Sequence, residues 1–333
     1  MVFCKDVGER KVIEILTGKF ERMPNMPIPF GDDVSAYPLD GGCLIILKTD
    51  MLAGETDIPP GRSLWQAARK AVVMNVSDFA AKGVKPLCML VSLGLPGNLA
   101  VEELEKIGEG LNAGAREYGL YIVGGDTNEA SDLIVSLSVF GIAKGDAVIT
   151  RRGAKPGDIV AVTGLFGKTS AGLKMLLEGF KASQEVGQSI IESLYMPKAR
   201  LNEGLSLAST GAVTASIDSS DGLAWSLHEI SMSSNVGFLV DNPPLAPEAK
   251  AFADEHGLDP LELMLYGGEE YELVLTINPQ LWDKAEDAVK RAGGRLIPIG
   301  RVTTGNLIVL ESQNERRVVA PRGWEHFKGA NDG

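Results

Sequence analysis

Apolar and polar residues follow two different periods along this chain, and the two periods alternate. Patterns typical of strands cover, in the first half, residues 34–49, 87–95, 120–123 and 133–143. Helical spacing of apolar residues covers residues 6–20, 63–82 and 99–118. The second half continues with strands near 159–163, 212–217, 236–240, 271–277, 295–302 and 307–310 and helices near 168–179, 188–194, 197–209, 221–234, 247–256 and 280–292. This alternation predicts an α/β or α+β fold.

The length and the turn residues predict two domains. A chain of 333 residues is long for a single hydrophobic core. A joint rich in turn-forming and charged residues, 151–158, separates the two halves, and Asp40-Gly41-Gly42 predicts a hairpin turn inside the first. We therefore expect an N-terminal domain of residues 1–147 and a C-terminal domain of residues 148–333.

Several apolar runs are followed directly by an aspartate. The run Tyr121-Ile-Val is interpreted as a buried strand that stops at Gly124-Gly125 before Asp126. The other members of the set end in Asp33, Asp50, Asp78, Asp218 and Asp221. A single aspartate after a strand is more often a turn residue or a helix cap, but the repetition favours a shared role.

Aspartates of this kind indicate a site for hard cations. Ligand sets made only of oxygen select Mg²⁺, Mn²⁺ or Ca²⁺ and disfavour Zn²⁺, and the chain has only three histidines. The aspartates are too scattered for an EF-hand loop, which needs its ligands within about twelve residues. Scattered acids converge only through the fold, which favours an enzyme site where cations meet phosphate.

Charge and composition narrow the classes of partner. The formal net charge of −12 argues against nucleic acid and against an anionic membrane surface. A phosphate ligand would require divalent cations between the like charges. No apolar run reaches the length of a membrane span, the first ten residues are too charged for a secretory signal, and the three cysteines have no CxxC spacing. A cytoplasmic protein is therefore expected.

Two glycine-rich segments resemble nucleotide loops without matching them. The segment from Gly164 to Thr169 would be a Walker loop only with a glycine at position 162, where the chain has Val162. A strand, a glycine-rich turn and a helix start still form a weaker anion site. The glycines of residues 108–114 lie within a predicted helix, where they are expected to serve packing.

Seven motifs together give the chain a family resemblance. They are Gly31-Asp32-Asp33, Thr49-Asp50-Met51-Leu52, residues 75–83 (NVSDFAAKG), Gly124-Gly125-Asp126-Thr127, residues 151–158 (RRGAKPGD), residues 217–223 (IDSSDGL) and residues 266–273 (YGGEEYEL). In this order they resemble the thiamine-monophosphate kinases from about residue 31 to the end of the chain. Single motifs are shared with relatives such as aminoimidazole ribonucleotide synthetase. The resemblance implies an N-terminal domain whose mixed sheet pairs with that of a second subunit in a homodimer. It also implies a C-terminal α/β domain with a mixed sheet.

The resemblance also implies roles for individual residues. Those similar to the family's metal ligands are Asp33, Thr49, Asp50, Asp78, Asp126, Asp218 and Asp221. Those similar to its ATP contacts are Gly125, Asp126, Arg151 and Ser220. Glu269 and Trp324 are similar to residues that face the thiamine moiety, for which a carboxylate and an aromatic face are suitable partners.

Three positions depart from the family pattern. The residue before Thr49 is commonly a small hydroxyl residue and is Lys48 here. A histidine often stands about seven residues after the strand-end aspartate, where this chain has Asp57, which we expect near the substrate. The family's Gly-Gly-Glu-Asp is Gly-Gly-Glu-Glu here, a conservative change.

The reaction implied by the resemblance is transfer of the γ-phosphoryl group of ATP to thiamine monophosphate, which gives thiamine diphosphate. The acceptor phosphate has a second pKa of about 6, so it is largely the dianion at neutral pH and needs no general base. Several Mg²⁺ ions would assist direct in-line transfer without a covalent enzyme intermediate, with Asp50, Asp126 and Asp218 central. The alternatives are another ATP-cleaving synthetase of the same superfamily, acting on a ribonucleotide or an amide, and a non-catalytic nucleotide-binding relative.

Overall fold

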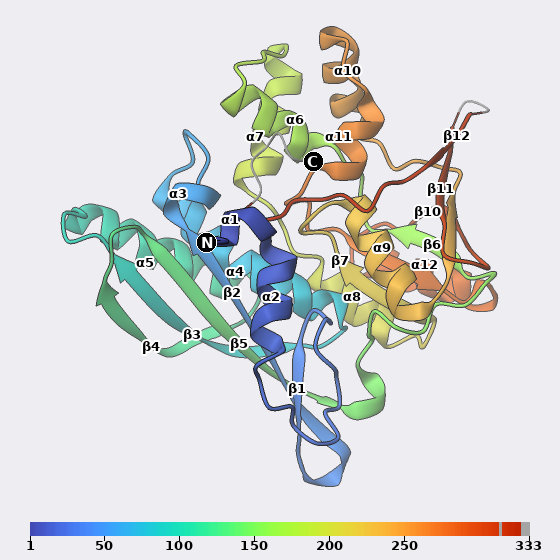
Figure 1. Ribbon diagram of the computed structural model, residues 1–333, viewed down its shortest axis with the longest axis horizontal. Coiled ribbons are helices and arrows are strands. Elements are labelled where there is room, and N and C mark those ends of the chain that lie inside the picture. The colour runs from blue at the N-terminus through green and yellow to red at the C-terminus, as the bar shows by residue number, and fades with distance from the viewer. Residues whose placement is uncertain (313–314, 328–333) are drawn as a thin grey trace.

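The N-terminal half forms a five-stranded mixed sheet with helices on one face (Figure 1). The structure, a computed structural model, describes residues 1–312 and 315–327. The strand order is β1-β2-β5-β3-β4, and only the β3–β4 pair is parallel. The strands are β1 (Ser35–Pro38), β2 (Cys43–Ala53), β3 (Pro86–Leu95), β4 (Tyr121–Glu129) and β5 (Ile134–Lys144). The helices of this half are α1 (Cys4–Val7), α2 (Glu9–Thr17), α3 (Gly54–Asp57), α4 (Leu64–Ala81) and α5 (Val101–Glu117), with 3-10 turns η1 (Asp40–Gly42) and η2 (Gly145–Ala147).

The C-terminal half forms a second mixed sheet of seven strands, in the order β12-β11-β8-β10-β6-β9-β7. Only β8 and β11 are parallel. The strands are β6 (Ile159–Val162), β7 (Val213–Asp218), β8 (Gly237–Val240), β9 (Leu273–Ile277), β10 (Ile297–Thr303), β11 (Ile308–Ser312) and β12 (Glu315–Val318). The helices are α6 (Lys168–Leu177), α7 (Gln184–Tyr195), α8 (Leu201–Ala208), α9 (Leu223–Ser234), α10 (Pro247–His256), α11 (Pro260–Tyr266) and α12 (Trp282–Arg291), with η3 (Pro279–Leu281). Two mixed sheets, each combined with helices, confirm the predicted fold class.

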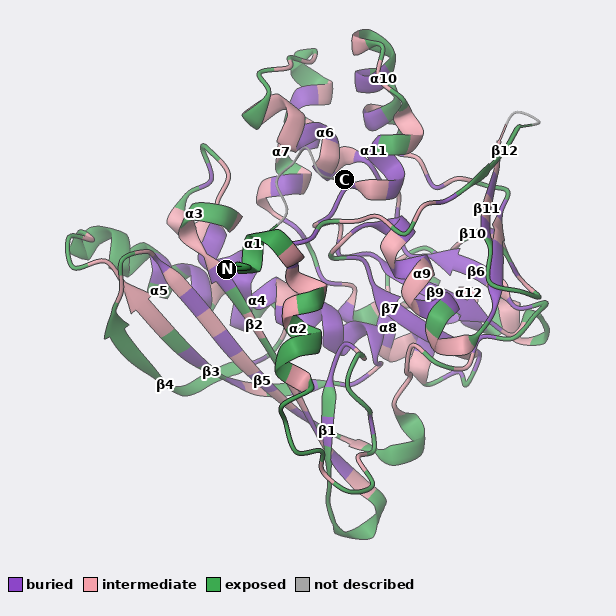
Figure 2. Cartoon of the chain, viewed as in Figure 1, coloured by how far each residue is buried: buried purple, intermediate pink, exposed green. Residues whose placement is uncertain are grey.

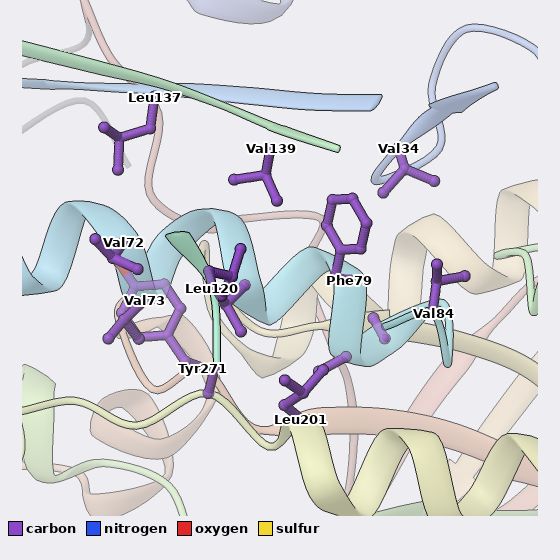
Figure 3. Close-up of a cluster of buried hydrophobic side chains, with 14 of the residues drawn as sticks. Val34, Val72, Val73, Phe79, Val84, Leu120, Leu137, Val139, Leu201 and Tyr271 are labelled. Carbon is purple, nitrogen blue, oxygen red and sulfur yellow. The ribbon is translucent and has the colours of Figure 1, made fainter. Parts of the chain in front are cut away.

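Helix α4 is the central element, because it packs against the N-terminal sheet on one side and against the C-terminal half on the other. Its start follows from Ser63, which accepts a hydrogen bond from the Gln66 N–H while Gln66 caps the Ser63 N–H in return. Phe79 on this helix packs below Val139 of β5 (Figure 3). Full burial of such a side chain contributes about 1.5–3 kcal/mol. Small residues let α8 approach closely, since a Cβ on Gly204 would lie 2.1 Å from the Ala80 carbonyl.

The main hydrophobic core continues across both halves. It joins the sheet-facing residues of the N-terminal half to Leu201, Tyr271 and Leu273 of the C-terminal half, and Figure 3 shows Leu201 and Tyr271 beside α4. Among the residues that the structure describes, no helix has the length and apolar character needed to cross a membrane.

The last part of β2 is a free sheet edge. Strand β1 pairs only with Leu44–Leu47 of β2, so the segment from Lys48 to Ala53 has β5 on one side alone. The exposed N–H of Asp50 donates instead to the side chain of Asn75 on α4, at 3.1 Å. This short β1 leaves the segment with Lys48 and Asp50 open toward the C-terminal half.

Strand β4 differs from its sequence-based prediction. The apolar run was expected to be buried and to end at Gly124, but the strand continues through Asp126 to Glu129 and all nine residues are exposed (Figure 2). Tyr121 and Val123 are 62% and 61% exposed. An apolar run predicts that a surface will be covered, and it does not reveal whether the cover belongs to the same chain. In this sheet β4 is the outer edge.

Several other element predictions need correction. Helix 6–20 is interrupted at Gly8, which has φ 77° and separates α1 from α2. Helix α11 and strand β12 were not predicted, since both are short. Within residues 108–114, Gly110 and Gly114 do serve close packing against α4, whereas a Cβ on Gly108 would meet nothing within 4 Å.

Candidate active site

A cleft of about 660 Å³ lies between the free edge of β2 and the C-terminal half. Its walls come from α4, from the turn between β7 and α9, from α2 and from the C-terminal segment. Figure 1 shows α2 in front of the region between the two sheets. Predicted site residues that line it are Thr49, Asp50, Asp78, Arg151, Asp218, Ser220, Asp221 and Trp324. The cleft therefore unites most of the residues singled out from the sequence.

Three carboxylates converge at the bottom of this region. Asp33 follows the irregular N-terminal segment, Asp78 lies in the last turn of α4, and Asp218 ends β7. Each offers an oxygen atom, and these atoms all lie within 4.8 Å of one another, with all three residues buried. Carboxylate oxygens at this spacing fit one hard divalent cation. The structure therefore brings three of the predicted ligands together, and the cation that they would share remains a prediction.

Two lysines and an arginine also enter the carboxylate cluster. The ammonium group of Lys48 lies 3.1 Å from Asp50 and 2.9 Å from Asp78. The fully buried Lys82 lies 2.6 Å from Asp32 and 2.7 Å from Asp33, and it donates to the Ser216 carbonyl of β7 at 2.8 Å. Lys82 therefore ties the two halves of the chain together at the site.

Arg151 pairs with the protein itself. Its guanidinium group binds Asp33, reaches Glu229 at 2.5 Å and donates to the Gly31 carbonyl at 2.9 Å. It holds the Gly31-Asp32-Asp33 loop against α9. The contact of Arg151 with ATP remains a prediction. The guanidinium group that would make this contact already has partners within the protein.

Burial leaves the cluster short of positive charge. Burial raises the pKa of Asp218 to about 7, with the neighbouring Asp33 carboxylate adding to the effect. Burial also holds the pKa of Asp78 well above its usual value, although Lys48 opposes the shift. In Asp33 burial is outweighed by Lys82 and Arg151, and its pKa is lowered. A divalent cation beside Asp78 and Asp218 would favour their ionised forms, so the electrostatics fit a metal ion as the geometry does.

The remaining predicted metal ligands surround this cluster. Asp50 contacts it through Lys48, and Asp221 lies in the cleft, where burial and the nearby Glu9 raise its pKa to about 6. The hydroxyl of Thr49 donates to the Leu137 carbonyl at 2.8 Å. That hydrogen bond commits the Thr49 side chain to the neighbouring strand.

Asp126 and Gly125 lie apart from the cluster in the single chain. Asp50 and Gly125 lie in the same cross-strand row of the sheet: Asp50 is paired with Leu137 of β5, Leu137 with Val91 of β3, and Val91 with Gly125. Three strand spacings of about 4.8 Å separate them by about 14 Å along the sheet. Asp126 lines a different, open hollow between β4 and α5. The expectation that Asp126 would gather with Asp33, Asp50, Asp78 and Asp218 is therefore wrong within one chain, because β4 is the edge of the sheet far from the free part of β2.

The predicted substrate residues form a second group beside the cleft. Glu269 pairs with the buried Lys70 and lies 3.6 Å from Arg62, both from the N-terminal half. Asp57 accepts a hydrogen bond from the Ala53 N–H at 2.8 Å, and its carbonyl accepts from both cations. Trp324, 48% exposed, donates its backbone N–H to the Asp221 carbonyl at 2.9 Å. Asp57 and Glu269 thus share Lys70 and Arg62, two residues that the sequence reasoning did not select.

The glycine-rich loop before α6 holds an internal anion. A carboxylate oxygen of Glu270 accepts hydrogen bonds from the N–H groups of Gly167 at 2.7 Å and Thr169 at 3.3 Å. Burial raises the pKa of Glu270 to about 7. The N–H groups at this helix start do bind an acidic group, as expected. That group is the side chain of Glu270 from the protein itself.

Some residues at the site had a signal in the sequence that was not used. Lys82 follows Asp78 by four positions, a spacing that places two residues on one helix face. Glu9 and Arg10 lie in the amphipathic N-terminal segment and line the cleft, where the Arg10 guanidinium stacks 3.3 Å from the centre of the Trp225 ring. Arg10 also reaches Glu325 at 3.4 Å. The N-terminal helix and the C-terminal segment therefore meet over the cleft, which no local pattern predicts.

Comparison with known proteins gives the site a family. Residues 31–143 match the family model described as AIR synthase related protein, N-terminal domain, and residues 155–312 match the corresponding C-terminal domain. A thiamine-monophosphate kinase of Nitrosopumilus maritimus is 37% identical over 89% of this chain and 93% of its own length. Another, from Pyrococcus horikoshii, is 36% identical over 90% and 92%.

A solved structure agrees with these relatives. AaThiL complexed with AMPPCP and TMP superposes with a TM-score of 0.84 at 27% identity, covering 98% of this chain and 99% of that one. The two family models cover residues 31–143 and 155–312, which include most of both sheets. The chain therefore belongs to the thiamine-monophosphate kinase family, whose two domains are of the AIR synthase related type.

Proposed function

We propose that this protein transfers the γ-phosphoryl group of ATP to thiamine monophosphate and so forms thiamine diphosphate. The observation that carries the proposal is the buried group of Asp33, Asp78 and Asp218, of which Asp78 and Asp218 line the cleft between the two sheets. A similar chain was solved with an ATP analogue and TMP. The named relatives, at more than a third identity, are thiamine-monophosphate kinases.

The acceptor phosphate supplies the attacking oxygen, and the protein positions the reacting groups and their charges. An oxygen of the acceptor phosphate forms a bond to the γ-phosphorus of ATP while the bond to the β,γ-bridging oxygen breaks and ADP leaves with the electron pair. The acceptor is already a dianion, so no residue has to remove a proton. The barrier comes from bringing anions together in line. Mg²⁺ ions, when bound, would neutralise phosphate oxygens on both partners.

The residues of the chain hold and orient these charges. Asp33, Asp78 and Asp218 would hold a metal ion at their common centre, with Asp50 and Asp221 at its border. Lys82 and Arg151 fix the loop that carries Asp33, which keeps the ligands in place before the substrates arrive. Ser220, whose carbonyl is bound by the Glu269 N–H at 2.7 Å, connects the metal side to the substrate side.

We assign thiamine recognition to the group around Trp324. Its ring lies at the rim of the same cleft, and an aromatic face suits a cationic thiazolium. Glu269 acts there together with Lys70 and Arg62, which pair with its carboxylate. Asp57 holds the same two cations through its backbone carbonyl.

We further propose a homodimer that pairs along β4. The strand is an exposed edge with an apolar start, and uncovered edges of this kind are suited to pairing with a second copy. This arrangement also gives Asp126 and Gly125 a role as contacts of ATP and metal, since the second copy can supply them to the cleft of the first. In this proposal residues 1–147 form the domain that pairs and residues 148–333 form the domain that completes the site.

A product assay tests the proposed function. The purified chain is incubated with ATP, Mg²⁺ and, in parallel, thiamine monophosphate, thiamine and an aminoimidazole-type ribonucleotide, and the products are identified by mass. We expect thiamine diphosphate and ADP in equal amounts. ATP cleavage only with the ribonucleotide would favour a synthetase, and ATP binding without turnover would favour a non-catalytic relative.

With three cysteines that form no disulfide among the described residues, we place this reaction in the cytoplasm.

A further inference from the structure

Lys48 lies where the family pattern commonly has a small hydroxyl residue, and its side chain reaches into the carboxylate cluster. Its ammonium group is 3.1 Å from a carboxylate oxygen of Asp50 and 2.9 Å from one of Asp78. The side chains of Lys48 and Asp78 are 19% and 8% exposed. One positive charge thus bridges two carboxylates, which is the arrangement that a bound metal ion would otherwise adopt.

The backbone holds Lys48 in this place. On β2 it lies opposite Val139, and Asp50 lies opposite Leu137, so both side chains project from the face that α4 covers. Figure 3 shows Val139 and Leu137 pointing toward α4. Asp78 lies on α4 itself. Strand and helix therefore direct the lysine and both carboxylates to one point from opposite sides.

An ammonium group and a divalent ion exclude each other at this point. Divalent ions bind carboxylate oxygens at about 2.0–2.6 Å, and a like charge in direct contact with the same oxygens is strongly unfavourable. One oxygen atom each of Asp33, Asp78 and Asp218 lies within 4.8 Å of the others, which is a second place where carboxylates converge and a divalent ion fits. Asp78 takes part in both groups: Lys48 binds it in the first, and in the second Lys82 and Arg151 bind Asp33.

We propose that the Lys48 ammonium group serves as a permanent cation of the active site and replaces one divalent ion between Asp50 and Asp78. The inference rests on the metal-dependent function proposed above and deepens it. With a small residue at position 48, Asp50 and Asp78 would have no such charge between them and would be free to bind a further divalent ion. The lysine lowers the number of ions that this protein must bind before it holds its substrates.

Metal counting tests the inference without recourse to activity. Bound Mn²⁺ is measured by equilibrium dialysis of the full chain with a non-hydrolysable ATP analogue, for the unchanged protein and for Lys48→Ser, Lys48→Arg and Lys144→Ser. Lys144, at the exposed end of β5, is a matched control on the same sheet. We expect Lys48→Ser to bind one Mn²⁺ more per chain than the unchanged protein, and the other two variants to bind the same number as it does. An unaltered count in a folded Lys48→Ser protein overturns the inference.

A second readout, the position of Mn²⁺ in crystals, and a separate check on the proposed function complete the test. If Lys48→Ser does not fold, Mn²⁺ is located in crystals of the unchanged protein by anomalous scattering. An ion coordinated by both Asp50 and Asp78, with Lys48 displaced, then overturns the inference, and an ion only at the position shared by Asp33, Asp78 and Asp218 supports it. Failure of the proposed function is recognised separately, because the product assay would then give no thiamine diphosphate, whatever the Mn²⁺ count.

Discussion

Asp78 and Asp126 lie in sequence contexts that predicted one common site, yet the chain surrounds them differently. Asp78 is buried, lies against Lys48 and belongs to a cluster drawn from α4, β7 and the loop before β1. Asp126 stands on an exposed edge strand beside a shallow hollow, with no ion pair found for it in the described residues (Figure 2). The three carboxylates of the first group meet within one chain, whereas Asp126 lies on a surface that we propose a second copy covers. Similar local sequence therefore indicates a role without indicating which chain provides the rest of the site.

The largest effect is expected at the complete site. Asp218→Asn removes a buried ligand charge while keeping the shape of the side chain, so phosphoryl transfer should fall by about 10³-fold or more, as loss of a key electrostatic group does. Steady-state kinetics at saturating Mg²⁺ measure it. Asp146→Asn, on the exposed turn η2, is the control and should retain full turnover. Near-normal turnover of Asp218→Asn would remove this residue from the site.

Asp126→Asn should lose almost as much activity as Asp218→Asn. Mixing the two variants should restore part of it. Asp126→Asn alone is expected to lose activity by orders of magnitude if the second copy delivers this carboxylate to the cleft. Mixed with Asp218→Asn subunits and allowed to exchange, it should regain roughly a quarter of normal activity, because half of the dimers then contain one intact site. If both aspartates serve the same subunit, mixing restores nothing, and the proposed exchange across β4 is wrong.

The edge strand itself should control the assembly. Val123→Lys places a charge on the exposed edge of β4, which disfavours strand pairing between copies. We expect the mass in solution to fall from dimer to monomer, measured by light scattering, and activity to fall with it. Val101→Lys, at the equally exposed start of α5, should remain dimeric. A dimeric Val123→Lys protein would place the interface elsewhere.

A moderate effect is expected from pH. The pKa of Asp218 in the folded chain is about 7, above its unfolded value, so its contribution to stability is complete below pH about 4 and is lost as the pH rises through 7. Mg²⁺ offsets this loss by binding the ionised form. The rise in melting temperature caused by Mg²⁺ should therefore be larger at pH 8 than at pH 6, with affinity about tenfold weaker per pH unit below 7. Equal shifts at both values would contradict a metal at Asp218.

The smallest effect is expected at Asp57. Asp57→Ala removes the acceptor for the Ala53 N–H, a hydrogen bond that contributes about 1 kcal/mol, and removes a negative charge near Lys70. The Michaelis constant for thiamine monophosphate should rise a few-fold while that for ATP stays the same. Asp132→Ala, which removes a similar bond to the Glu55 N–H in the same loop region, separates loop stability from substrate binding. An identical change in both variants would leave Asp57 without a specific role.

The sequence by itself determined the elements and the chemistry of the site. The hydrophobic periods located nearly all helices and strands, including the start of α4 near residue 63, and the oxygen-only set around Asp33, Asp78 and Asp218 pointed to hard cations. These features are local, because periodicity, capping and residue type act over a few positions.

Only the tertiary structure decided which of these groups meet. It brought Lys48 and Lys82 into the carboxylate cluster, gave Glu270 to the α6 helix start, and set Lys70 and Arg62 beside Glu269. It also exposed β4 and kept Asp126 out of the cluster. The physical reason is that the order of strands in a sheet, and the partners of a buried charge, depend on contacts between residues far apart in the chain, which no short window of sequence contains.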